Sequence, residues 1–163
     1  MRRRVVGVIG PGEGATSEER ERAQRLGALI AGRGWVLLTG GRNAGVMAAA
    51  ARGAREAGGL TVGILPGASP ADAAPDVEVA IPTGLGEARD QVVVLASDAL
   101  VCCGMSAGTA VEVALALGAG KPLVLLGVGP EATAFVRSLG RGDWRVAPDP
   151  ETAVAWLADL LRG

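Results

Sequence analysis

The sequence predicts an α/β protein built on one doubly wound, mostly parallel sheet with helices on both faces. Short apolar runs alternate with amphipathic stretches along the chain, and glycine-rich turns separate them. The apolar runs lack polar alternation, which is typical of strands that a parallel sheet buries on both faces. The length of 163 residues suits one domain, and no repeat or linker-like change in composition divides the chain. We therefore expect a single Rossmann-like domain over residues 1–163.

The N-terminal half opens on a five-residue apolar run that Gly10-Pro11-Gly12 closes, as expected for a buried strand. Ser17 is expected to cap the next helix, because its hydroxyl suits that position and two acidic residues follow it. The helix after the second strand is rich in alanine. The strands expected in this half span residues 5–9, 35–39, 60–65 and 77–81, and the helices span 17 to 32 or 34, 46–57 and 86–97.

The C-terminal half continues the alternation. Cys102 and Cys103 are adjacent in an expected strand, so they point to opposite faces of the sheet. We expect both to be small buried apolar side chains, which suits a reducing compartment. Pro150 fits the first turn of the closing helix. The strands expected here span residues 99–103, 122–126 and 144–147, and the helices span 109–117, 131–139 and 150–161.

The composition excludes several classes of function. The chain has no His and two Cys, which removes Ser-His-Asp and Cys-His catalysis, His-ligated zinc and Cys-only zinc, so we expect no metal site. A net charge of −1 and 2% aromatic residues give no footprint for nucleic acid. The apolar run after the N-terminal arginines is too short for a signal peptide, and no stretch is long enough to span a membrane. We expect a cytoplasmic protein.

Three glycine-rich loops each follow an expected strand and precede an expected helix. They span residues 10–14, 40–45 and 104–109, so a parallel sheet brings them to one edge. Glycine lets backbone amides approach an anion, and a helix N-terminus adds partial positive charge. The domain is therefore predicted to bind a small phosphate-bearing ligand, such as a nucleotide. The expected binding residues are Gly10, Gly12, Gly40, Gly41, Gly45, Ser106, Gly108 and Thr109.

None of these loops is a standard nucleotide fingerprint. Val46 follows Gly45 where a P-loop carries its lysine, and the glycine spacing of residues 10–14 differs from the dinucleotide-binding pattern. A P-loop NTPase and an NAD-dependent dehydrogenase are therefore disfavoured.

The last loop admits two interpretations. In the first, Thr109 is an N-cap and Glu112 reaches back to it as a capping box. In the second, the Ser106 and Thr109 hydroxyls bind phosphate and Glu112 faces the ligand. Arg89 is expected in the first turn of the preceding helix, where the helix dipole disfavours a cation. A ligand phosphate or Glu112 would compensate its charge, unless Arg89 is a solvated surface side chain.

At these residues the sequence resembles the LONELY GUY family of cytokinin riboside 5′-monophosphate phosphoribohydrolases, often mislabelled as lysine decarboxylases. Residues 40–47 (GGRNAGVM) resemble that family's Gly-Gly-Gly-x-x-Gly-Leu-Met-Gly motif. Residues 104–112 (GMSAGTAVE) resemble its Pro-Gly-Gly-x-Gly-Thr-x-x-Glu motif. The resemblance runs over residues 5–126 and implies that Arg89 and Glu112 occupy the positions of the catalytic pair.

Residues 53–67 (GAREAGGLTVGILPG) look closer to a sister branch that resembles molybdenum cofactor carrier proteins. This resemblance implies molybdenum cofactor as a cargo and no other required cofactor. It also implies a homodimer or higher homo-oligomer, packed through alanine-rich helices.

The chain departs from the hydrolase pattern at several positions. Gly104-Met105-Ser106 replaces Pro-Gly-Gly, and Met105 either crowds the phosphate or points into the core. Arg42 stands at the third glycine of the first motif. Asp90 follows Arg89 where the hydrolases usually carry lysine. These changes affect catalysis more than binding, so we favour a phosphate-ligand binding protein.

The alternative is hydrolysis of the N-glycosidic bond of a nucleoside 5′-monophosphate, releasing the base and ribose 5-phosphate. Glu112 would then stabilise an oxocarbenium-like transition state or activate water, and Arg89 would orient it. This chemistry needs neither His nor metal. Pyridoxal-dependent lysine decarboxylation is rejected, because the only lysine, Lys121, is predicted at the opposite edge of the sheet from the glycine loops.

Overall fold

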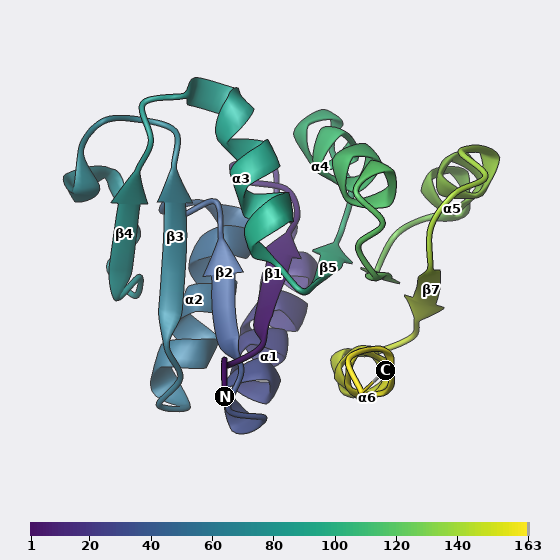
Figure 1. Ribbon diagram of the computed structural model, residues 1–163, viewed down its shortest axis with the longest axis horizontal. Helices are drawn as coiled ribbons and strands as arrows, with labels where there is room; N and C mark the ends of the chain where they lie inside the picture. The colour runs from purple at the N-terminus through teal and green to yellow at the C-terminus, as the bar shows by residue number, and fades with distance from the viewer. Residues whose placement is uncertain (163) are drawn as a thin grey trace.

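Seven parallel strands form one sheet in the order β4-β3-β2-β1-β5-β6-β7 (Figure 1). The computed structural model describes residues 1–162. Every neighbouring pair of strands in the sheet runs parallel, which confirms the predicted doubly wound α/β fold. The strands are β1 (Val5–Ile9), β2 (Val36–Thr39), β3 (Thr61–Leu65), β4 (Val79–Pro82), β5 (Ala99–Cys103), β6 (Leu123–Leu126) and β7 (Trp144–Ala147).

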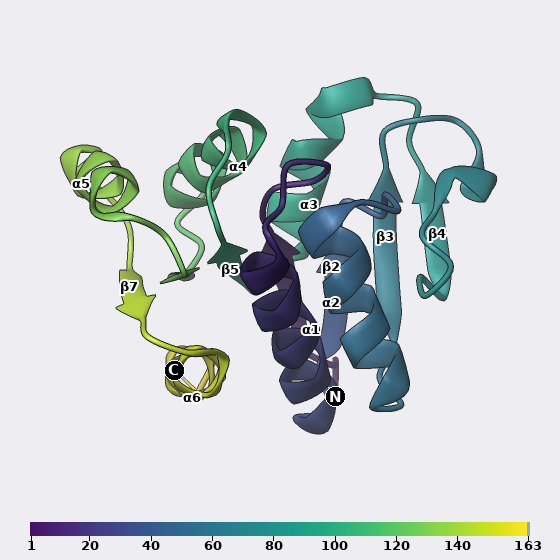
Figure 2. The ribbon, with the colours of Figure 1, turned by 180° about the vertical axis from the view of Figure 1, so that it is seen from behind.

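Helices cover both faces of the sheet, and they divide by the side on which they pack (Figures 1 and 2). One face carries α1 (Ser17–Gly32), α2 (Gly45–Glu56) and α6 (Pro150–Leu160), and the other carries α3 (Arg89–Ala96), α4 (Ala107–Gly118) and α5 (Pro130–Ser138). Two short 3-10 turns, η1 (Pro70–Asp72) and η2 (Gly86–Ala88), complete the fold. The single helix expected over residues 86–97 is therefore η2 followed by α3. None of the helices in residues 1–162 has both the length and the apolar character that crossing a membrane requires.

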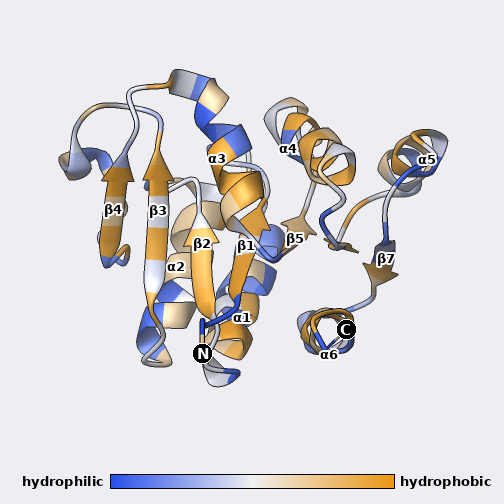
Figure 3. Cartoon of the chain, viewed as in Figure 1, coloured by the Kyte–Doolittle hydropathy of each residue, from blue (hydrophilic) through white to orange (hydrophobic). Residues whose placement is uncertain are grey.

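The two faces of the sheet bury separate apolar cores, and the strands are apolar along most of their length (Figure 3). Cys103 belongs to the core under α1, α2 and α6, whereas Cys102 belongs to the core under α3, α4 and α5. Both side chains are fully buried free thiols. The predicted placement of the two cysteines on opposite sheet faces is confirmed. Burial raises the pKa of both thiols, that of Cys103 to about 12, so neither is a reactive thiolate at neutral pH.

The N-cap of α1 is Thr16, and the expectation of Ser17 is wrong by one residue. The Thr16 hydroxyl accepts a hydrogen bond from the Glu19 amide at 3.1 Å, and the Glu19 carboxylate accepts one from the Thr16 amide at 3.0 Å. This reciprocal pair is a capping box, and it requires the acid three residues after the cap. Ser17 has no acid at that spacing, since residue 20 is Arg20.

Helices α1 and α2 pack with their backbones in close contact because glycine occupies the crossing. A Cβ atom on Gly53 of α2 would lie 1.8 Å from the carbonyl oxygen of Gln24 in α1. A Cβ atom on Gly27 of α1 would lie 2.1 Å from the carbonyl oxygen of Ala50. These contacts involve backbone atoms that cannot rotate away. The crossing sets the position of α2, and therefore of the loop that precedes it at the carboxyl edge of the sheet.

We expect Gly53→Ala to destabilise the protein by about 1–3 kcal/mol, because the methyl group must push two helix backbones apart. Gly32→Ala in α1 is the matched control, because a Cβ atom on Gly32 would have no other atom within 4 Å. That substitution should be neutral or stabilise by up to about 1 kcal/mol, since alanine favours the helix. Urea unfolding midpoints measure both effects. Equal midpoints for the two variants would contradict the close-packing account.

Candidate functional site

The three glycine-rich loops follow three adjacent strands, β2, β1 and β5, and lie at their carboxyl ends. The chain runs outward from β1 to β4 on one side and then returns to place β5 on the other side of β1. The point between β1 and β5 is thus where the strand order reverses, the usual place for a ligand in an open α/β sheet. The three loops therefore lie together at the carboxyl edge of the sheet, as predicted from the sequence.

A cavity of about 390 Å³ opens at this point. Eight of the ten residues predicted to bind or act on the ligand line it: Gly10, Gly12, Gly40, Arg89, Ser106, Gly108, Thr109 and Glu112. Gly41 and Gly45 do not. Side chains that were not among the expected binding residues also line the cavity, namely Glu13, Arg42, Met47, Glu87, Asp90 and Val111.

Gly41 and Gly45 serve the loop itself, and both have positive φ angles, of 78° and 46°. A Cβ atom on Gly45 would lie 2.1 Å from the carbonyl oxygen of Gly12, so the two loops touch there. The amide of Val46 donates to the carbonyl of Pro11 at 3.0 Å. The first glycine loop thus caps the N-terminus of α2, and the Val46 amide is used in joining the two loops.

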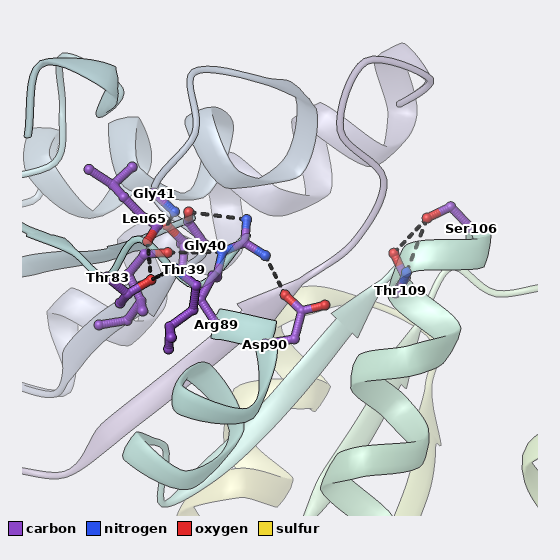
Figure 4. A network of polar contacts seen from close by, with 11 residues as sticks. Thr39, Gly40, Gly41, Leu65, Thr83, Arg89, Asp90, Ser106 and Thr109 are labelled. Atoms are coloured by element: carbon purple, nitrogen blue, oxygen red, sulfur yellow. Dashed lines mark hydrogen bonds and ion pairs between the residues drawn. The ribbon is translucent and has the colours of Figure 1, made fainter. Parts of the chain in front are cut away.

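The N-terminus of α4 faces the cavity, and its cap differs from the expected one. Ser106 is the N-cap, and its hydroxyl accepts from the Thr109 amide at 3.3 Å and lies 2.8 Å from the Thr109 hydroxyl (Figure 4). The expected capping box of Thr109 with Glu112 is therefore wrong. Nothing lies within 4 Å of a Cβ placed on Gly108, so the first turn is open on that side. The amides of such a turn have no partner within the helix and can bind an anion.

Arg89 begins α3 and lines the cavity, and neighbouring groups of the protein hold its guanidinium. Its Nε donates to the carbonyl of Ile64 at 3.0 Å, and one terminal nitrogen donates to the carbonyl of Gly40 at 3.4 Å. The other terminal nitrogen pairs with the carboxylate of Asp90 (Figure 4). Both side chains are about nine-tenths buried, at 11% and 10% exposure. The charge partner of Arg89 is Asp90, so the expectation of a solvated arginine and that of a pair with Glu112 are both wrong.

Glu112 lines the same cavity one turn into α4, and no hydrogen-bond partner is seen for its carboxyl group among residues 1–162. Burial raises the pKa of Glu112 to about 8, with a further upward contribution from the charge of Asp90 and a downward one from Arg89. At pH 7 this side chain is mostly neutral. Glu112 thus lines the cavity, and the second interpretation of the sequence, in which it faces a ligand, stays a prediction.

Two further residues singled out in the sequence have settled positions. Met105 is partly buried against the core under α3, α4 and α5, so it does not crowd the cavity. The Nζ of Lys121 donates to the carbonyls of Leu95 and Ser97, at 3.2 and 2.7 Å, at the amino edge of the sheet. Its predicted position opposite the glycine loops is confirmed. Among residues 1–162, no group of three or more His, Cys, Asp or Glu side chains is arranged to hold a metal ion.

The charged lining carries more acid than base. It contains two arginines, Arg42 and Arg89, and four carboxyl groups, those of Glu13, Glu87, Asp90 and Glu112. Each arginine is paired with a carboxylate, Arg42 with Glu13 and Arg89 with Asp90. Sequence reasoning noticed Arg42 and Asp90 only as departures from motifs. The signal that could have identified Arg42 was a basic side chain inside a glycine motif, and the signal for Asp90 was an acidic side chain next to Arg89.

The raised pKa of Glu112 predicts a specific pH dependence of stability. Between pH 4.5 and about 8 the folded protein keeps a proton that the unfolded chain has released, so stability falls as pH rises through this window. Glu112→Gln removes this pH dependence. As pH rises through the window, the free energy of unfolding of the variant should therefore increase relative to that of the wild type by up to about 1.4 kcal/mol per pH unit. Urea unfolding at pH 5, 6, 7 and 8 measures the difference. Stability curves that run parallel for the two proteins would contradict a raised pKa of the half-buried Glu112.

Solved structures that match nearly the whole chain include two molybdenum cofactor proteins. The molybdenum cofactor binding protein from the phototrophic bacterium Rippkaea orientalis is 44% identical, with 99% of each chain covered and a TM-score of 0.93. The molybdenum cofactor carrier protein from Chlamydomonas reinhardtii is 49% identical, with 99% of this chain and 100% of the other covered and a TM-score of 0.94.

A shorter match involves a hydrolase. The cytokinin riboside 5′-monophosphate phosphoribohydrolase of Mycobacterium tuberculosis is 50% identical over 50 residues, which are 31% of this chain and 27% of the other. The resemblance to the LONELY GUY superfamily is thus confirmed, and the carrier branch is the one matched over the full length. A model of the SLOG cluster4 family matches residues 3–153. The chain belongs to the SLOG cluster4 family, on the molybdenum cofactor carrier-like branch of the LONELY GUY superfamily.

Proposed function

We propose that this protein binds molybdenum cofactor, a phosphate-bearing pterin, at the carboxyl edge of β1, β2 and β5, and carries it without transforming it. The observation that carries the proposal is the agreement over 99% of the chain with two proteins described as a binder and a carrier of this cofactor. The cavity lies at the switch point of the sheet, where α/β proteins of this kind hold their ligands.

The ligand phosphate is proposed to lie at the N-terminus of α4. The hydroxyl of Ser106 and the open first turn at Gly108 line the cavity there. Backbone amides and the helix dipole favour a dianionic phosphate at such a place. The neutral Glu112 nearby supports the proposal, because an ionised carboxylate in this cavity would repel the ligand.

Carriage is favoured over N-glycosidic hydrolysis by the state of the two residues expected to be catalytic. Arg89 is bonded to Asp90 and to the backbone carbonyls of Ile64 and Gly40, so it does not orient Glu112. Stabilising an oxocarbenium-like transition state requires an ionised carboxylate, and burial of Glu112 raises its pKa and so works against that role. The short match to a hydrolase remains the support for the alternative.

We propose further that the protein self-associates and is cytoplasmic. Self-association is supported by Leu95 of α3 and Phe135 of α5, large apolar side chains that are 56% and 45% exposed on helices of the same face of the sheet. Two buried free thiols are consistent with a reducing compartment.

We expect the purified protein to retain molybdenum cofactor released from a molybdoenzyme, measured as protein-bound molybdenum and pterin fluorescence after desalting. Gly108→Leu should lower retention at least tenfold, because its side chain projects into the cavity where the phosphate is proposed to lie. Gly118→Leu is the matched control. Gly118 lies in the same helix, a Cβ atom placed on it would have no other atom within 4 Å, and it does not line the cavity. Equal retention by the two variants would contradict the proposed site.

The hydrolase alternative has a separate test. We expect no release of base from a panel of nucleoside 5′-monophosphates, because Glu112 is neutral and unpaired with Arg89. Chromatographic detection of free base at pH 7, with Glu112→Ala as the control, measures this. Base release by the wild type that Glu112→Ala abolishes would overturn carriage without turnover and establish the alternative.

A further inference from the structure

Arg42 is the second arginine of the cavity. Hydrogen bonds fix the backbone around it, whereas its side chain is exposed. The Gly41 amide donates to the Thr39 hydroxyl at 3.0 Å, and the Gly41 carbonyl accepts from the Ala74 amide at 2.8 Å. Residue 42 itself forms an isolated antiparallel bridge with Ala73. The backbone of Arg42, in the β2–α2 loop, is thus held by hydrogen bonds to the segment that follows β3.

The side chain of Arg42 extends from there to the β1–α1 loop, where its guanidinium lies. One of its terminal nitrogens lies 3.9 Å from a Cβ atom placed on Gly12, and another pairs with the carboxylate of Glu13. Both charged side chains line the cavity, and both are largely exposed, at 45% and 71%. The pair therefore lies at the mouth of the cavity, where solvent reaches both partners.

The two arginines of the cavity differ in what a ligand would have to displace. If Arg89 turns to a ligand, it loses its hydrogen bonds to the buried Asp90 carboxylate and to the backbone carbonyls of Ile64 and Gly40. Breaking such a buried pair leaves an uncompensated charge and is strongly unfavourable. Arg42 gives up one exposed carboxylate that water can then solvate, and exposed pairs of this kind contribute little.

We propose that Arg42 is the arginine that binds the anionic group of the ligand, and that Glu13 occupies it as an internal counter-ion until the ligand arrives. The inference rests on the proposed function, since it assigns a residue to the same cavity and restricts the ligand to an anion. The phosphate replaces the Glu13 carboxylate on Arg42, and a guanidinium is well matched to it because it can donate two parallel hydrogen bonds.

The assignment also explains how a cavity with more carboxyl groups than arginines admits an anion. Release of Glu13 into solvent moves one negative charge away from the ligand as Arg42 moves onto it. Three other acidic groups line the cavity. Asp90 is neutralised by Arg89, Glu112 is mostly protonated at pH 7, and Glu87 is exposed to solvent. Once Glu13 has left, Arg42 offers the ligand an unpaired positive charge, while Glu87, which pairs with neither arginine of the lining, is exposed to screening solvent.

A double-mutant cycle on retention of molybdenum cofactor tests the inference. Arg42→Gln should weaken binding roughly tenfold or more, since it removes a charge-assisted contact. Glu13→Gln should strengthen binding about two- to fivefold, because it removes a competitor worth about as much as an exposed ion pair. The double variant should bind like Arg42→Gln alone, because without Arg42 there is nothing for Glu13 to compete for. Arg52→Gln, an exposed arginine of α2 outside the cavity, is the control and should bind like the wild type.

The outcomes separate the two proposals. If the wild type retains cofactor and Arg42→Gln retains it equally well, the role of Arg42 is overturned while the proposed function stands. If Glu13→Gln strengthens binding equally with and without Arg42, Glu13 acts by general repulsion and the competition is overturned. If the wild type retains no cofactor, the proposed function fails and the inference fails with it.

Discussion

The buried ion pair between Arg89 and Asp90 is the interaction on which the carboxyl edge of this sheet depends. Arg89 ties the first turn of α3 to the carbonyls of Ile64 and Gly40, and so to the ends of β3 and β2. Asp90 makes this burial of a guanidinium possible, because removing either partner of such a pair costs about 3–5 kcal/mol. The pair also determines the chemistry of the cavity, since an arginine held in this way is not available to a ligand or to Glu112.

The three glycine loops differ in what their backbone amides and carbonyls contact. Gly45 brings the second loop against the first, and the Pro11 carbonyl caps the helix that follows. The β5–α4 loop instead presents an open helix N-terminus, with Gly108 facing free space. One amide at the start of each of the three helices already has a partner, and we place the anion at α4 because Gly108 leaves its first turn open where it lines the cavity. The exposed Arg42 adds the charge that Arg89 cannot supply.

Much of this architecture could be predicted from the sequence, because buried parallel strands leave continuous apolar runs and glycine marks the loops between them. The opposite placement of Cys102 and Cys103 follows from the pleat alone, and the shared edge of the three loops follows from parallel strand direction. The caps could not be placed as well. Several hydroxyl residues stand near each helix start, and the spacing of the acid or the turn of the backbone selects among them, giving Thr16 and Ser106.

The partner of Arg89 was beyond the reach of sequence reasoning for a different reason. Neighbours in a helix do not normally face each other, so Asp90 was not an obvious counter-ion, and the pairing depends on how α3 enters above the strands after η2. The pair of Arg42 with Glu13 joins residues 29 positions apart, on two different loops. No local pattern encodes such a contact. It becomes visible when the loops are brought together at the edge.

A crystal structure of the protein with molybdenum cofactor bound tests the central claim most directly, because that claim assigns the two arginines opposite roles. The account predicts that Arg89 keeps its bonds to Asp90 and to the Ile64 and Gly40 carbonyls, while Arg42 has left Glu13 and contacts the ligand's anionic group. A structure in which Arg89 has left Asp90 to bind the phosphate, with Arg42 still paired to Glu13, would contradict it.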